Sequence, residues 1–198
     1  MKQDDFQRPK LTLPEDEARA LSHAYGQASV ILEYGSGGST VLGAEMAGKT
    51  IFSVESDAEW LANMRHYFAA HPPLATLHLH HGDIGPTRGW GHPLDDDDFR
   101  SWPDYPTKIW SAKGFVHPDL VLIDGRFRVA CFLTTLFSIT KPLRVLFDDY
   151  LDRPAYAAIE EVVRPTAYVG RMAQFDLTPT PIPPAKLGWI VGQFLQSI

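Results

Sequence analysis

Residues 30–40 constrain this chain most, because they combine a strand, a glycine-rich turn and the start of a helix. Residues 30–32 form a short apolar run, which is typical of a buried parallel strand. Glycines follow at 35, 37 and 38, and Ser39-Thr40 suit the first turn of a helix. Glycine lets the backbone adopt positive φ and touch a ligand, and a helix N-terminus offers free N–H groups. The stretch therefore predicts a cradle for a small polar molecule.

Apolar runs alternate with amphipathic segments along most of the chain. The predicted strands are 30–32, 50–55, 76–81, 119–125 and 144–149, and helical patterns separate them. This alternation predicts an α/β fold with a doubly wound, mostly parallel sheet and helices on both faces. Ala167–Leu177 and Gly188–Leu195 resemble two more strands, joined by a proline-rich segment. We expect them to complete a seven-stranded sheet with an antiparallel C-terminal edge.

The length of 198 residues fits one domain over 1–198, given the usual ~100–200 residues per domain. An irregular insertion at about 84–113 interrupts the pattern and contains three tryptophans and four consecutive aspartates, Asp95–Asp98. Loops of this length in compact domains are usually functional. We expect the insertion to lie over the site.

The formal net charge is −6, which argues against nonspecific binding to nucleic acid or to an anionic membrane. Cys131 is the one cysteine, so no internal disulfide is possible. The first residues carry no apolar signal segment, and no apolar run is long enough to span a bilayer. These features predict a cytoplasmic protein that acts on a small molecule, and they leave its oligomeric state open.

Acidic side chains stand where each of the first five predicted strands ends. They are Glu33, Glu55, Asp83, Asp124, Asp148 and Asp149. Parallel strands present their carboxyl ends at one edge of a sheet, which is where α/β folds bind ligands. Glu55 lies 20 residues after Gly35, a spacing that suits a carboxylate accepting hydrogen bonds from two ribose hydroxyls. The sequence therefore predicts a nucleoside-binding crevice at this edge.

The pattern Glu33-x-Gly35-x-Gly37-Gly38 resembles the first motif of the class I S-adenosylmethionine (SAM) methyltransferases. A dinucleotide fingerprint would need its third glycine at position 40, which is Thr40. The resemblance covers roughly residues 29–150 and implies SAM as cofactor, with Glu33 near its amino-acid end. It assigns cofactor binding to Glu33, Gly35, Ser36, Gly37, Gly38, Glu55, Ser56, Asp83, Ile84 and Asp124.

Asp124 and the pair Asp148-Asp149 resemble the metal ligands of catechol-type O-methyltransferases. That resemblance implies catalytic roles for Asp124, Asp148, Asp149 and Arg126, and a possible Mg²⁺ site made by the three aspartates. Two departures weaken it, since Asp149 replaces an asparagine and Arg126 stands where the general-base lysine is expected. The alternative is a structural network in which Arg126, Arg128 and Arg153 neutralise the carboxylates. Without a metal, proton removal would fall to Asp148, Asp149, Tyr150 or a histidine such as His92 or His117.

We predict a SAM-dependent methyltransferase acting on a small molecule, most readily at oxygen. Asp124-Gly125-Arg126-Phe127 is not the proline-containing tetrad of the base and amide N-methyltransferases. Two alternatives stay open: a SAM- or nucleoside-binding module without turnover, and an NAD-type oxidoreductase using the same cradle. The sequence does not indicate the methyl acceptor.

Overall fold

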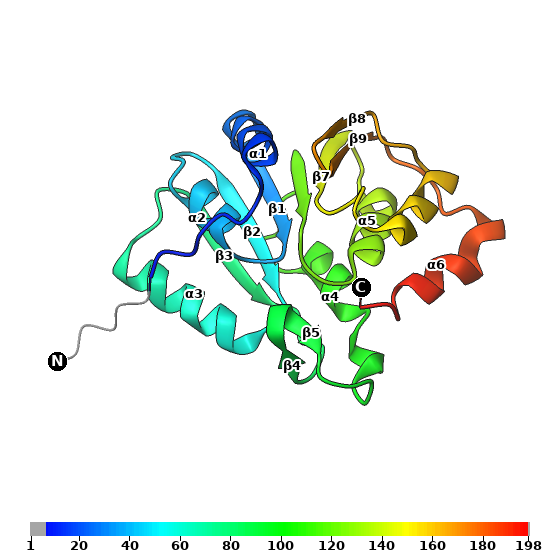
Figure 1. Ribbon diagram of the computed structural model, residues 1–198, viewed down its shortest axis with the longest axis horizontal. Helices are drawn as coiled ribbons and strands as arrows, with labels where there is room; N and C mark the ends of the chain where they lie inside the picture. The colour runs from blue at the N-terminus through cyan, green and yellow to red at the C-terminus, as the bar shows by residue number, and fades with distance from the viewer. Residues whose placement is uncertain (1–6, 198) are drawn as a thin grey trace.

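One mixed sheet runs through the molecule and carries the residues of the predicted site. The computed structural model describes residues 7–197, and the sheet order is β3-β2-β1-β6-β7-β9-β8 (Figure 1). Its strands are β1 (Val30–Tyr34), β2 (Thr50–Glu55), β3 (Thr76–His81), β6 (Leu120–Ile123), β7 (Leu143–Phe147), β8 (Ala167–Val169) and β9 (Met172–Leu177). The first five pair in parallel, and β9 is antiparallel to both of its neighbours. The predicted fold class is confirmed.

The helices alternate with the strands along most of the chain. They are α1 (Glu15–Gln27), α2 (Gly38–Ala44), α3 (Ala58–Ala70), α5 (Arg128–Ser138) and α6 (Leu187–Gln193), with the 3-10 helices η4 (Pro154–Glu161) and η5 (Pro184–Lys186). The Asp57 carboxylate accepts the Trp60 N–H at 2.9 Å and so caps α3, which ends just before Pro72. Helix α1 begins after Pro14 with three acidic residues in its first turn.

Alternate side chains of each strand enter two separate apolar layers. Ile31 packs with Leu21 and Tyr25 of α1, whereas the adjacent Leu32 belongs to the layer that contains Phe132 of α5. Successive side chains of a strand point to opposite faces of the sheet, and here both faces are buried. Helices therefore cover both faces of the sheet.

The segment 84–113 is built of short pieces rather than one long element. They are β4 (Thr87–Arg88), η1 (Gly89–Gly91), β5 (His92–Pro93), η2 (Phe99–Ser101), α4 (Asp104–Thr107) and η3 (Lys108–Ser111). Trp102, Tyr105 and Ile109 are buried and anchor the segment in the same layer as α5. The acidic run Asp95–Asp98 is exposed.

The C-terminal part of the prediction is wrong in one element. Gly188–Leu195, expected as a strand, lies mostly in α6, because Ile190, Gln193 and Phe194 turn inward at helical spacing. Both edge strands come instead from Ala167–Leu177, which folds back at Gly170 and Arg171 to form the β8–β9 hairpin. Within residues 7–197, no helix has the length and apolarity that crossing a membrane requires.

Candidate functional site

The glycine-rich turn after β1 lies against the turn after β6. Gly35 has φ of +101°, and a Cβ added there would lie 2.8 Å from the Cα of Gly125. The Gly35 N–H also donates to the Val54 carbonyl at 2.8 Å, which ties the turn to β2. Helix α2 then begins at Gly38. The ends of β1, β2 and β6 therefore converge on this turn, as a crevice at the carboxyl edge requires.

Glu55 ends β2, and its carboxylate is bound by backbone groups of both neighbouring turns. Oε2 accepts the Ser36 N–H at 3.0 Å, and Oε1 accepts the N–H groups of Ser56 at 2.8 Å and Asp57 at 2.9 Å. Burial raises the pKa of Glu55, and these N–H donors act against the rise. Glu55 therefore joins the glycine-rich turn to the start of α3, and its predicted contact with a ribose stays a prediction.

Glu33 lies at the end of β1 but points toward α1 and is completely buried. Its Oε1 accepts the Tyr25 O–H at 2.5 Å, and its Oε2 has no hydrogen-bond partner among the described residues. Burial raises the pKa of Glu33, and the hydrogen bond from Tyr25 acts against the rise. The contact between Glu33 and the amino-acid end of SAM stays a prediction.

Two contacts hold the glycine-rich turn from outside. The Trp60 indole N–H donates to the Ser36 carbonyl at 2.8 Å. The backbone of Lys10 and Leu11 lies directly against Gly38, where a Cβ would collide with it. Gly37 differs, because its φ is 175° and a Cβ there would have no atom of the described chain within 4 Å. No intramolecular contact therefore requires glycine at position 37.

The insertion covers the end of β2. The Ser56 O–H donates to the Gly91 carbonyl at 2.9 Å, and Gly91 is buried against Ser56 and Glu55. At the next strand end, Asp83 is exposed and its Oδ1 accepts the Gly85 N–H at 3.1 Å, while Ile84 is buried in the core. The predicted cofactor contacts of Asp83 and Ile84 stay predictions. Two hollows of about 260 and 380 Å³ contain none of the predicted site residues.

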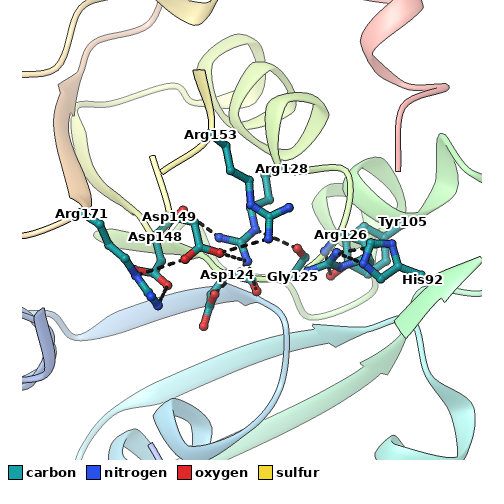
Figure 2. Close-up of polar contacts among 10 residues, drawn as sticks. All are labelled: His92, Tyr105, Asp124, Gly125, Arg126, Arg128, Asp148, Asp149, Arg153 and Arg171. Carbon is teal, nitrogen blue, oxygen red and sulfur yellow. Dashed lines mark hydrogen bonds and ion pairs between the residues drawn. The ribbon is translucent and has the colours of Figure 1, made fainter. Parts of the chain in front are cut away.

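The structure brings Asp124, Asp148 and Asp149 together where β6 and β7 end (Figure 2), with one ligand atom of each within 4.8 Å of the others. Their accessibility differs, since the Asp124 side chain is 30% exposed and that of Asp148 only 1%. Burial and the charges of Asp148 and Asp149 raise the pKa of Asp124 to about 7, although Arg128 acts against the rise. Asp124 is thus the most accessible carboxylate of the three.

Three arginines neutralise this aspartate cluster. Arg128 lies 3.1 Å from both Asp124 and Asp149 through Nη2. Arg171 donates to both oxygens of Asp148, at 2.8 and 3.2 Å, and lies 3.1 Å from Asp149. Arg153 lies 3.4 Å from Asp149.

The aspartates have the donor chemistry that Mg²⁺ prefers, but each is already paired with a guanidinium. A divalent cation would add two positive charges to a cluster whose formal charges already cancel, and it would compete with the arginines for the same oxygens. The paired cluster therefore does not fit Mg²⁺, and its counterions are arginines.

Arg126, an expected member of this network, instead points toward the insertion (Figure 2). Its Nη1 donates to Nε2 of His92 at 2.6 Å, and its Nε has no partner among the described residues. Burial, followed by the charge of Arg126, lowers the pKa of His92. Because a guanidinium carries only donors, His92 accepts as a neutral imidazole.

Strained backbone marks the loops around the site. Phe127, Asp149 and Trp90 have φ values of +51°, +58° and +65°, which side chains other than glycine rarely adopt. Phe127 follows Arg126 and caps α5, Asp149 follows β7, and Trp90 lies two residues before His92. Such conformations persist where the surrounding structure fixes them, often at functional sites.

Sequence reasoning missed Arg171 and the bond from Tyr25 to Glu33. Arg171 lies in the β8–β9 turn, where its N–H also donates to Glu17 of α1 at 2.9 Å. A glycine inside an apparent strand often marks a turn, so Gly170 carried the signal that would have placed Arg171 at a strand end. Tyr25 fits the apolar spacing of α1, so nothing in its position indicated a hydrogen bond to Glu33.

The comparison with solved structures includes a close relative. A methyltransferase-like protein from Silicibacter pomeroyi DSS-3 is 50% identical and superposes with a TM-score of 0.93, covering 96% of this chain and 98% of that chain. No family model matches the sequence, and no curated protein matches it.

Two distant structures share the fold alone. The O-methyltransferase TomG from Streptomyces achromogenes, solved with SAM, is 16% identical with a TM-score of 0.53, covering 86% of this chain and 82% of TomG. An RNA methyltransferase from Salinibacter ruber, solved with S-adenosyl-L-homocysteine, is 14% identical with a TM-score of 0.51, covering 88% of this chain and 97% of that chain. Their different acceptors mean that the fold does not identify the acceptor of this chain.

Proposed function

The chain belongs to the class I SAM-dependent methyltransferases, and on that premise we propose that it methylates a small molecule at oxygen. The observation that carries the proposal is the 50% identity with a methyltransferase-like protein over nearly the whole of both chains. The glycine-rich turn agrees with it, since Gly35 and Gly125 bring the ends of β1 and β6 into backbone contact.

The residues around the turn fit SAM by their chemistry. The Glu55 carboxylate ends β2, where a ribose can donate to it, and Gly37 leaves the backbone open to a ligand. Glu33 keeps one buried oxygen without a partner. We assign cofactor binding to these residues and to Ser36, Gly38, Ser56, Asp83 and Ile84. SAM supplies an electrophilic methyl group, so the protein needs no nucleophile of its own.

Asp124 is the general base in this proposal. It is the most exposed aspartate of the cluster, and it directly precedes Gly125, which touches the glycine-rich turn. A carboxylate there accepts the proton that a hydroxyl group loses as it is methylated. Asp148 and Asp149 serve a positioning role, because Arg128 and Arg171 hold both of them.

We further propose that transfer is independent of a metal. Arg128, Arg153 and Arg171 supply the positive charge that Mg²⁺ would otherwise bring to the aspartates. Full activity in EDTA supports this assignment, and strict dependence on added Mg²⁺ overturns it while leaving methyl transfer intact.

Thermal unfolding with SAM, S-adenosylhomocysteine, NAD⁺ and NADH tests the cofactor. A ligand that binds only the folded state adds about 2.7 kcal/mol at a hundred times its dissociation constant. We expect stabilisation by the two adenosyl compounds alone, followed by transfer of a labelled methyl group to members of a hydroxyl-bearing acceptor panel. Absence of stabilisation by both adenosyl compounds contradicts the proposal. Binding without turnover over a broad panel would favour the silent binding module.

A further inference from the structure

Arg126 is a buried guanidinium without an anionic partner. The residue is 6% exposed, and no Asp or Glu within residues 7–197 forms an ion pair with it. Its contact at Nη1 is with neutral His92, and its Nε–H has no acceptor. A buried charge is strongly unfavourable unless it is paired, so the chain leaves this cation without the counterion that burial demands.

The neighbouring arginines show that carboxylates are within reach of this loop. Arg128 follows Arg126 by two residues, yet its Nη2 lies 3.1 Å from both Asp124 and Asp149. Figure 2 shows Arg126 on the other side of Gly125, beside His92 and Tyr105 and away from the aspartates. Phe127 lies between the two arginines and has a left-handed backbone conformation, so the side chains of Arg126 and Arg128 point in different directions. The surrounding structure fixes this conformation and keeps Arg126 apart from the carboxylates.

Other buried donors without partners lie close to Arg126. Among the described residues, the Trp102 indole N–H and the Tyr156 O–H have no hydrogen-bond partner. Trp102 packs against Phe127 with ring centroids 5.4 Å apart, and Tyr156 is near enough to act on the pKa of Arg126. Positive charge from four arginines, Arg126, Arg88, Arg153 and Arg128, also lowers the pKa of His92 after burial itself. The region offers donors and positive charge, which is what an anion recognises.

We propose that the methyl acceptor is an anionic small molecule whose carboxylate or phosphate group pairs with Arg126 beside His92. The inference rests on the proposed function, because it assigns the acceptor side of the same site. A planar guanidinium binds two oxygens of either group, so the chemistry shared by carboxylate and phosphate is what the structure specifies.

Calorimetric titration of the protein saturated with S-adenosylhomocysteine tests the inference. The probes are benzoate and phenyl phosphate, with benzamide as neutral counterpart of benzoate, at an ionic strength kept constant with chloride. The variants are Arg126→Met, Arg126→Lys and Arg164→Met, the last at an exposed arginine outside the site. We expect benzoate or phenyl phosphate to bind and benzamide not to. Which of the two binds more tightly distinguishes a carboxylate from a phosphate acceptor.

Arg126→Met should weaken anion binding at least tenfold, Arg126→Lys should weaken it less, and Arg164→Met should leave it unchanged. Arg126→Lys keeps the charge and serves as the comparison if Arg126→Met does not fold. Equal binding of benzamide and the anions overturns the inference. So does a matching loss of S-adenosylhomocysteine affinity in Arg126→Met, since the anion would then be the cofactor's own carboxylate. Failure of the wild type to bind S-adenosylhomocysteine counts against the proposed function instead.

Discussion

The Arg126 guanidinium donates from Nη1 to Nε2 of His92 at 2.6 Å, and this bond joins the loop after β6 to the insertion. A protonated imidazole has no lone pair to accept it, so the bond exists only while His92 is neutral. Burial and then Arg126 lower the pKa of His92 accordingly. The protonation of His92 is therefore coupled to the position of the Arg126 side chain.

This coupling predicts how His92 responds to acid. Its folded pKa lies below its ordinary value, so the unfolded chain takes up the proton first and stability falls as pH drops below ~6.5. An NMR titration of the His92 ring should show the lowered pKa, and Arg126→Met should move it toward the ordinary value. Arg164→Met is the control of equal charge change, and an identical pKa in both variants contradicts the coupling.

Arg126→Met should make the unliganded protein more stable. The variant removes a buried charge that has no ion-pair partner within the described chain, and an apolar side chain of similar length fills its place. Replacing buried ionic groups by apolar ones is often neutral or stabilising by about 1–4 kcal/mol. Urea unfolding without ligand measures the change. A clear loss of stability would mean that the bond to His92 is worth more than the buried charge costs.

Arg128→Met should have the opposite effect. Arg128 is 3% exposed, contacts Asp124 and Asp149, and donates to the Asp148 carbonyl at 2.7 Å. Removing one partner of a buried ion pair costs about 3–5 kcal/mol, because here Asp124 is left without an ion-pair partner among the described residues. Arg153→Met is the matched control, since Arg153 is 40% exposed and lies 3.4 Å from Asp149. Such an exposed pair contributes about 0–1 kcal/mol, and equal losses in urea unfolding would contradict the difference.

The strands and the strand-end carboxylates could be predicted from sequence because both depend on local pattern. The predicted strand 76–81 has the bounds of β3, and Asp124, Asp148 and Asp149 meet because parallel strands end at one edge. The pairing of those carboxylates depends on which arginine reaches them in space. Arg171 comes from a hairpin turn, and the left-handed backbone of Phe127 separates Arg126 from Arg128. Neither feature produces a repeating pattern in the sequence, so neither could be predicted from it.

The error at residues 188–195 has a related cause. Trp189, Ile190 and Val191 favour strands by composition, but the segment buries Ile190, Gln193 and Phe194 against the layer of α5. Tertiary packing therefore makes this segment helical. Gly170, a turn residue inside an apparent strand, was the local signal that the edge pair lay entirely within 167–177.

Gly35 and Gly37 of the turn should respond differently to alanine. Gly35→Ala puts a side chain on a residue with φ of +101° and a Cβ 2.8 Å from the Cα of Gly125. Backbone strain alone costs about 1–3 kcal/mol. Gly37→Ala meets no atom within 4 Å and should leave stability within about 0.5 kcal/mol, yet weaken S-adenosylhomocysteine binding about tenfold if the ligand touches that backbone. Thermal unfolding and calorimetry separate the two effects, and unchanged affinity in Gly37→Ala would place the ligand elsewhere.

Ionisation of Asp124 should lower the stability of the fold and, at the same time, produce the base that the reaction needs. Burial, together with Asp148 and Asp149, raises its pKa from 3.8 to about 7. Between these values the unfolded chain has lost the proton while the folded protein keeps it, so stability falls as pH rises through that window. Asp124→Asn should remove this slope from urea unfolding measured across the window, and an unchanged slope would assign the proton to another group. The form that can accept a proton from an acceptor is the ionised one, so the carboxylate becomes an effective base only as the pH reaches about 7, at the upper end of this window.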